Sequence, residues 1–97
     1  MKLRFHRLVQ SDVDDAMIYY ERVGNRMLVE DFYDEVIAFA NTAAALPTKF
    51  HPISSRFRRA NLKRFPYHLL YEIRRDYVFV TVVKHHSRRP SFGTRRA

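Results

Sequence analysis

The chain has 97 residues, of which 46% are hydrophobic and 14% aromatic, and it contains no cysteine. This length and composition predict one packed domain over residues 1–97 and favour a packed globule over a disordered chain. The lack of cysteine excludes a disulfide framework, a thiol nucleophile and a thiolate zinc site, and a cytoplasmic location is expected. No apolar run approaches the length of a membrane span, and the charged first residues do not form a signal peptide.

Basic and acidic residues are unevenly distributed along the chain, whose net charge is +8. Residues 1–46 hold five Lys or Arg and eight Asp or Glu, a balance of −3. Residues 47–97 hold thirteen bases and two acids, a balance of +11. Such an excess attracts polyanions, which include nucleic acid, an acidic protein and anionic lipid. Charge alone does not choose among them.

The first elements predicted are a short edge strand over residues 2–8 and a helix after it. The alternation of the strand leaves His6 exposed. Ser11 is expected to cap the helix, with Asp14 at the capping-box position. One apolar stripe follows on this helix: Val13, Ala16, Met17 and Tyr20. Gly24-Asn25 is expected to end this helix and to begin the next.

A second, longer helix is predicted over residues 26–46. It carries two adjacent apolar stripes, Leu28, Phe32, Val36, Phe39, Ala43 and Leu46 beside Val29, Tyr33, Ile37 and Ala40. This apolar face is wider than one neighbouring helix requires. Either the helix packs on its partner helix and on a sheet together, or part of the face receives another chain.

The remaining elements predict a sheet. Residues 47–55 form a loop with two prolines, and residues 56–62 alternate as a strand. Residues 67–73 and 77–83 are rich in aromatic and β-branched side chains and flank a charged break, which predicts a β-hairpin in the middle of a sheet. Pro66 marks the entrance to the hairpin. The predicted fold is α+β, a two-layer β-α-α-β-β-β arrangement with a helical hairpin on a largely antiparallel sheet.

A dense cationic and titratable run, from His85 to Pro90, follows the hairpin, and a basic tail with Phe92 follows over residues 91–97. Adjacent residues of a strand point to opposite faces, so His85 and His86 are not expected to share a metal ion. We expect no metal and no cofactor. Residues 85–90 are either a surface that binds a target or a solvated strand end whose arginines pair with the acidic residues of the helices.

These features together resemble the RelE/ParE toxin superfamily of type II toxin–antitoxin systems over nearly the whole chain. The segments that carry the resemblance are Tyr19-Tyr20-Glu21, residues 32–36, Leu46-Pro47, Arg59, Arg64-Phe65-Pro66-Tyr67, Tyr71 and His85-His86-Ser87-Arg88-Arg89-Pro90. The ending His-x-x-Arg-Arg-x-Pro is most similar to the ParE branch and its plasmid-stabilisation relatives. Many of those relatives have tryptophan near the position of Phe92.

The resemblance implies two partners. One is a cognate antitoxin, acidic in its toxin-binding segment, which covers the helical hairpin and the sheet. Its expected contacts on this chain are Tyr20, Leu28, Phe32 and Val36. The other is a target, DNA gyrase for ParE-like toxins or messenger RNA on the ribosome for RelE-like toxins. The expected target-binding residues are Arg59, Arg64, His85, His86, Arg88, Arg89 and Phe92.

The residues present fit an inhibitor of gyrase better than a ribonuclease. A ribonuclease would use Arg59, His85, His86, Arg88 and Arg89, because cations stabilise the phosphate and imidazoles transfer protons near neutral pH. The RelE branch usually adds a lysine-rich second strand and a C-terminal tyrosine, whereas this chain has arginines and Phe92. A further alternative is a non-enzymatic nucleic-acid-binding module that stacks bases on Phe57, Tyr67 and Tyr71.

Overall fold

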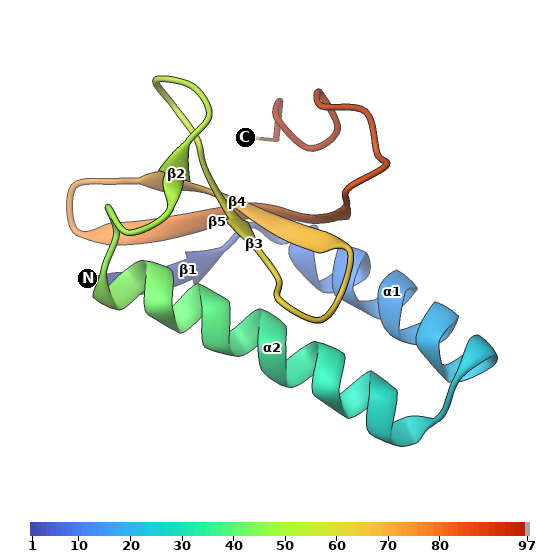
Figure 1. The fold of residues 1–97 in the computed structure, drawn as a ribbon. Helices are drawn as coiled ribbons and strands as arrows, with labels where there is room; N and C mark the ends of the chain where they lie inside the picture. Colours follow the sequence, from blue (N-terminus) through green and yellow to red (C-terminus); the bar gives the residue numbers. More distant parts are fainter. Residues whose placement is uncertain (97) are drawn as a thin grey trace.

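The computed structural model of the protein describes residues 1–96. Its elements are β1 (Lys2–Phe5), α1 (Val9–Val23), α2 (Arg26–Ala45), β2 (His51–Pro52), β3 (Arg58–Asn61), β4 (Tyr67–Ile73) and β5 (Tyr77–His85). The five strands form one sheet in the order β1-β5-β4-β3-β2, and both helices cover the same face of it (Figure 1). The predicted α+β fold is therefore confirmed. The structure also contains a strand that was not predicted, β2, which is two residues long and lies inside the predicted loop.

The sheet is antiparallel except at β1, which runs parallel to β5 from Lys2 opposite Tyr77 to Phe5 opposite Val80. The predicted strand over residues 2–8 is shorter because the chain turns at His6. The imidazole Nδ1 of His6 accepts a hydrogen bond from the Leu8 backbone N–H at 3.1 Å. The expectation of an exposed His6 is wrong, since the residue is 5% exposed.

The first helix begins two residues before the predicted cap. Val9 is its first residue, and Ser11 lies in the first turn, where its hydroxyl donates to the Leu8 carbonyl. Asp14 accepts from the side chain of Gln10 rather than completing a capping box. The predicted boundary between the helices is confirmed, because the Asn25 side chain accepts from the Leu28 N–H and begins α2.

An aromatic cluster joins the helices to the sheet. Phe32 of α2 has no exposed surface, and its ring packs edge to face against Phe65 and Tyr67 at centroid distances of 5.2 and 5.0 Å. Tyr20 of α1 packs against Phe65 at 5.1 Å. Burial raises the pKa of Tyr20 to about 12. Aromatic pairs in such geometry add about 1 kcal/mol each beyond the area they bury, so this cluster fixes the helical layer on the sheet.

A β-bulge at Thr81 changes which side chains of β5 face the helices. Leu70 pairs with Val82 and Tyr71 with Val80, so Thr81 is the extra residue. Val80 packs in the main core under the helices, whereas Val82 packs with Phe57 and Leu70 in a smaller cluster. The bulge thus supplies apolar side chains to both faces of the sheet.

The C-terminal segment, residues 86–96, crosses the face of the sheet opposite the helices, which we call the outer face (Figure 1). Phe92 packs against the cluster that contains Val82. Gly93 has φ of +80°, and a Cβ there would lie 2.7 Å from the Val82 side chain, so glycine is required for this approach. The buried Lys84 ammonium donates to the carbonyl oxygens of Arg89, Pro90 and Phe92 at 3.4, 2.9 and 2.9 Å. No helix within residues 1–96 has the length and apolar character to cross a membrane.

The side chains of Asp12 and Arg96 bind backbone groups at the edge of β5, along the part of that strand that β1 does not pair with. Their side chains form two hydrogen bonds of 2.6 and 2.9 Å and are 7% and 12% exposed. Asp12 also accepts from the Val83 N–H at 3.1 Å, and Arg96 donates to the Thr81 carbonyl at 3.0 Å. The ion pair therefore satisfies the edge groups of β5 beyond the end of β1 and ties α1 to the C-terminal segment.

We predict that Asp12→Ala lowers the free energy of unfolding by about 3 kcal/mol, because it leaves a buried guanidinium and a backbone N–H without their partner. Urea unfolding followed by far-UV circular dichroism measures the change. Asp14→Ala is the control, since Asp14 lies on the same helix but is exposed, with its carboxylate accepting from the Gln10 side chain. Equal effects of the two substitutions would contradict the role given to Asp12.

Candidate functional site

The sheet divides the cationic run after β5 into two groups on opposite faces. His85 faces the helices, where its ring contacts Tyr67 at a centroid distance of 5.1 Å. His86 faces the outer side, where its ring stacks on His68 at 5.1 Å. The expectation that the two adjacent histidines point apart follows from strand geometry, and the structure has this arrangement.

The outer group consists of Arg59, Asn61, His68 and His86, which we call the outer cluster. Arg59 donates from Nε to the Asn61 side-chain oxygen at 2.7 Å and from Nη2 to His86 Nδ1 at 3.2 Å. His68 Nδ1 lies 2.9 Å from His86 Nδ1. Because Arg59 can only donate, we assign His86 Nδ1 as the acceptor and His68 Nδ1 as a second donor to it. His86 then carries its hydrogen on Nε2.

Burial, and after it the neighbouring cations, lowers the pKa of both histidines of the outer cluster. Burial, followed by Arg59 and His86, lowers the pKa of His68 from 6.5 to about 3. Burial and Arg59 also lower the pKa of His86. Among residues 1–96, no carboxylate forms an ion pair with Arg59, His86 or Lys84. The cluster is therefore an unbalanced positive site.

The second group lines a cleft of about 250 Å³ between α1 and the end of β5. Tyr19, Tyr67, His85, Arg88 and Phe92 form its polar and aromatic walls, together with Asp12, Asp15, Ala16, Val83 and Lys84. Burial raises the pKa of Tyr67, Tyr19 and Asp15 act in the same direction, and Arg88 opposes them. Arg88 lies over the Phe92 ring at 4.5 Å. The cleft can receive one planar or aromatic group with hydrogen-bonding edges.

The structure brings together most, but not all, of the predicted target-binding residues. Arg59 and His86 share the outer cluster, and His85, Arg88 and Phe92 share the cleft. Arg89 is exposed, with its carbonyl bonded to Lys84. Arg64 lies apart from both groups, because it pairs with Asp31 of α2 at 3.2 Å and its backbone N–H donates to Glu35 at 2.9 Å. Arg64 therefore holds the β3–β4 turn against the helix.

The side chains predicted to contact the antitoxin are mostly part of the core. Tyr20, Phe32 and Val36 are 8%, 0% and 2% exposed, and Leu28 is half-buried. Phe32 is buried in the aromatic cluster between the helices and the sheet. A partner protein that binds this conformation of the chain would therefore contact other residues of the same helices. The wide apolar face of α2 thus serves mainly to pack on two layers of the protein itself.

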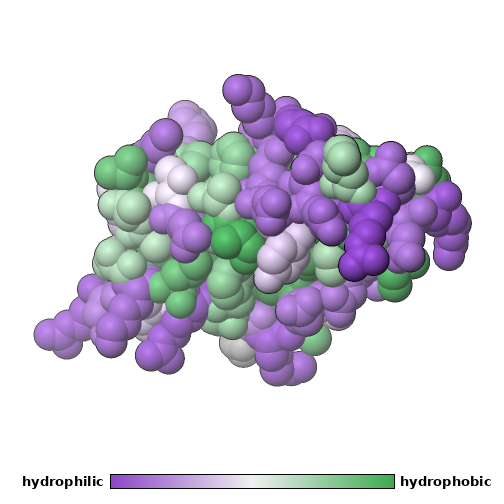
Figure 2. Space-filling view, turned by 90° about the horizontal axis from the view of Figure 1, so that it is seen from below, coloured by the Kyte–Doolittle hydropathy of each residue, from purple (hydrophilic) through white to green (hydrophobic). Residues whose placement is uncertain are grey.

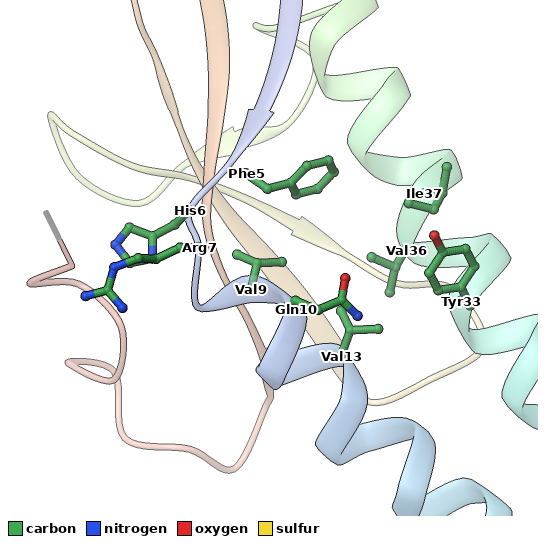
Figure 3. Close-up of a pocket in the computed structure, with 9 residues that line it drawn as sticks. All are labelled: Phe5, His6, Arg7, Val9, Gln10, Val13, Tyr33, Val36 and Ile37. Atoms are coloured by element: carbon green, nitrogen blue, oxygen red, sulfur yellow. The ribbon is translucent and has the colours of Figure 1, made fainter.

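An open groove remains beside those core residues. It has a volume of about 300 Å³ and lies between β1, α1 and α2 (Figure 3). Phe5 points from β1 toward Ile37 and Tyr33 of α2, while Val13 and Gln10 of α1 form the facing wall. The side chains of His6 and Arg7 point away from the groove. Figure 2, which faces the helical layer, shows apolar side chains gathered across its middle and bordered by hydrophilic ones.

Sequence analysis missed His68, Asn61 and Tyr19 as members of these groups. Lys84 is the pairing partner of His68, and His86 lies two residues farther along the chain, so this relation depends on strand register. Alternation within residues 67–73 could have placed His68 on the face opposite Leu69. It could not have shown that His86 reaches His68.

The base-stacking surface predicted for Phe57, Tyr67 and Tyr71 is not formed, because Tyr71 is fully buried and its hydroxyl donates to the Pro47 carbonyl.

Comparison with solved structures gives a similar fold. The "Chromosomal ParDE TA system from P. aeruginosa" contains a chain that superposes with a TM-score of 0.75 at 13% identity, covering 88% of this chain and 95% of that chain. At this identity the likeness concerns the fold, and at that level the resemblance inferred from sequence is confirmed. No family model and no curated protein sequence matches the chain.

The buried, neutral state of His68 predicts that stability decreases in mild acid. Unfolded chains bind a proton at this histidine below pH 6.5, whereas the native state does not until about pH 3. The free energy of unfolding should therefore fall by up to about 2 kcal/mol between pH 7 and pH 5. His68→Phe should flatten this dependence in urea unfolding curves, and His51→Phe, at an exposed histidine, should not. Parallel pH profiles for the two variants would refute the assignment.

Proposed function

We propose that the chain is the toxin of a ParE-like toxin–antitoxin pair that inhibits DNA gyrase by binding, and that an antitoxin neutralises it. The observation that carries the proposal is the fold likeness to a ParDE system over 88% of this chain, combined with exposed cations at the end of β5. A fold alone does not determine a function, so the charges and the groove on the surface of this protein support the proposal as well.

Acidic and basic residues, which are segregated along the sequence, also lie on different faces of the protein. The acids of α1 and α2 lie on the helical layer, and Asp14, Glu21 and Asp34 are exposed there. The strands and the C-terminal segment carry Arg59, Arg88 and Arg89 without carboxylate partners among residues 1–96. The favourable surface for an anionic target region is therefore the end of β5 and the outer face.

The same asymmetry divides the expected contacts of an antitoxin. An acidic segment would be repelled by the helical layer and attracted to the basic strands and C-terminal segment. The groove between β1 and the helices suits apolar side chains, because Phe5, Val13 and Ile37 line it. We therefore propose an antitoxin with one apolar stretch in this groove and one acidic stretch near Arg88 and Arg89.

Two features favour inhibition by binding over RNA cleavage. The lone pair of His86 Nδ1 already accepts from Arg59 and His68, so this nitrogen is not free to remove a proton. Phe92 is held under Arg88 and has no hydroxyl, and the Tyr71 hydroxyl is bonded to the Pro47 carbonyl. Cations are present for binding, whereas neither His86 Nδ1 nor these two aromatic residues supplies a free general base.

The groove yields a test of antitoxin binding. Ile37→Asp should weaken the complex with the antitoxin, sought as the co-expressed product of a small neighbouring gene, about a hundredfold, because an unpaired carboxylate would be buried against Phe5 and Val13. Ala38→Asp places the same charge at the next, exposed position and should change the affinity little. Isothermal titration calorimetry measures both. Equal affinities for the two variants would exclude the groove as the contact.

The target is tested by inducing the chain in cells, with plasmid supercoiling and transcript ends followed over time. We expect loss of gyrase-dependent supercoiling and no early transcript cleavage. Replacing Arg88 and Arg89 with alanine should weaken gyrase inhibition by about ten- to thirtyfold, since each lost contact is worth about 1 kcal/mol. The double substitution of Arg22 and Arg26 on the helical layer removes the same charge and should retain inhibition.

Codon-positioned cleavage of transcripts within minutes, with supercoiling unchanged, would overturn the gyrase proposal in favour of a ribonuclease. Normal growth with soluble, folded protein would overturn the toxin proposal itself. Circular dichroism of each purified variant separates loss of contact from loss of fold.

A further inference from the structure

Ser87 and His85 form a hydrogen-bonded pair on the turn that follows β5. The Ser87 backbone N–H donates to His85 Nδ1 at 2.9 Å, and the Ser87 hydroxyl oxygen lies 2.8 Å from the same nitrogen. Because the backbone group can only donate, His85 Nδ1 is the acceptor, and we assign the hydroxyl as a second donor to it. The hydroxyl hydrogen therefore points at the imidazole, and the Oγ lone pairs are open to solvent because Ser87 is exposed.

The turn holds this pair in place. The Arg88 N–H donates to the His85 carbonyl at 3.0 Å and closes the turn, and the His86 N–H donates to the Pro66 carbonyl at 2.9 Å. The His85 ring packs edge to face against Tyr67 at a centroid distance of 5.1 Å. Backbone and ring are both fixed, so the hydroxyl and the imidazole stay within the distance that proton transfer requires.

The partner of the Ser87 hydroxyl distinguishes it from other Ser and Thr hydroxyls of the chain. Those of Ser11, Thr42, Thr81 and Thr94 donate to backbone carbonyl oxygens. A carbonyl oxygen does not take up a proton near neutral pH, whereas an imidazole nitrogen does. A serine hydroxyl 2.8 Å from such a nitrogen has the geometry in which an adjacent base activates a nucleophile.

The surroundings of Ser87 favour an anionic reacting group. Arg88 and Arg89 are exposed, and neither forms an ion pair with a carboxylate among residues 1–96. The transition state of phosphoryl transfer carries negative charge on its equatorial oxygens, which neighbouring cations stabilise. His85 and Arg88 also line the cleft of about 250 Å³, which gives a small phosphoryl donor room beside the pair.

We propose that Ser87 is a phosphoacceptor, with His85 as its general base and a phosphoric anhydride as the donor. Ser87 Oγ attacks the terminal phosphorus and forms a P–O bond, the P–O bond of the anhydride breaks, and the released oxygen leaves as an anion. The hydroxyl proton passes to His85 Nδ1 and from there to solvent. The product is a serine phosphate, which carries about two negative charges next to Arg88 and Arg89.

The reactivity is tested on the purified chain with diisopropyl fluorophosphate, whose leaving group is fluoride. Peptide mass spectrometry should locate the adduct at Ser87, formed about a hundredfold faster than adducts at the exposed Ser55 and Ser91. Acetyl phosphate, a phosphoric anhydride, should then phosphorylate the same residue and release acetate. Equal rates at the three serines, or a fluorophosphate adduct with no phosphorylation by acetyl phosphate, would overturn the proposal.

Matched variants test the role of His85. His85→Gln should slow the reaction at Ser87 about a hundredfold, because an amide keeps a hydrogen-bonding group but takes up no proton. His51→Gln removes an exposed histidine of β2 and should leave the rate unchanged. An unchanged rate in folded His85→Gln, checked by circular dichroism, would contradict the assignment. If His85→Gln is unfolded, the wild-type chain in urea replaces it, and an excess rate at Ser87 that survives unfolding would contradict the assignment equally.

Phosphorylation would reduce the basic surface that the proposed function uses, and this consequence alone rests on that function. A serine phosphate pairs with Arg88 and Arg89 by charge-assisted hydrogen bonds and withdraws them from an anionic target. Ser87→Glu should therefore weaken gyrase inhibition about tenfold, and Ser91→Glu less than about twofold. Equal weakening by the two substitutions would overturn the regulatory consequence. A wild-type chain that does not inhibit gyrase would contradict the proposed function, whereas the reactivity of Ser87 is decided on the purified chain in either case.

Discussion

The fold depends on how the edge of β5 is satisfied beyond the point where β1 ends. β1 covers only the first part of β5, from Tyr77 to Val80, so backbone groups that follow would face the gap without a strand. The Asp12–Arg96 ion pair occupies that position, with the carboxylate on the Val83 N–H and the guanidinium on the Thr81 carbonyl. It joins the first turn of α1, β5 and the C-terminal segment. Buried charges are tolerated here because each is paired and hydrogen-bonded.

The C-terminal segment is held to the outer face by charged as well as apolar contacts. Phe92 packs on Val82, Gly93 permits the close approach, and the Lys84 ammonium binds three carbonyl oxygens of the segment. Lys84 is therefore a structural cation, and Arg96 is one as well. The charge available to a partner is therefore smaller than the net charge indicates, because both of these cations are held within the protein.

The placement of the two groups of candidate residues follows from the pleat of β5. His85 turns to the cleft with Tyr67 and Arg88, and His86 turns to Arg59 and His68. One chain segment thus supplies side chains to two surfaces with different neighbours. The cleft is aromatic and mixed in charge, whereas the outer cluster is cationic, so the two surfaces favour different ligands.

Local periodicity and turn chemistry in the sequence predict the α+β class, the two helices with their boundary at Gly24-Asn25, and the hairpin. The sequence also indicated the divergence of His85 and His86, since strand geometry is local. The pairing of Asp12 with the edge of β5 and the packing of Phe32 in the core depend on tertiary contacts. The tertiary structure also brought His68 beside His86. Those outcomes depend on register, the bulge at Thr81 and contacts between residues distant in sequence, as in Asp12 with Arg96, and no local pattern encodes them.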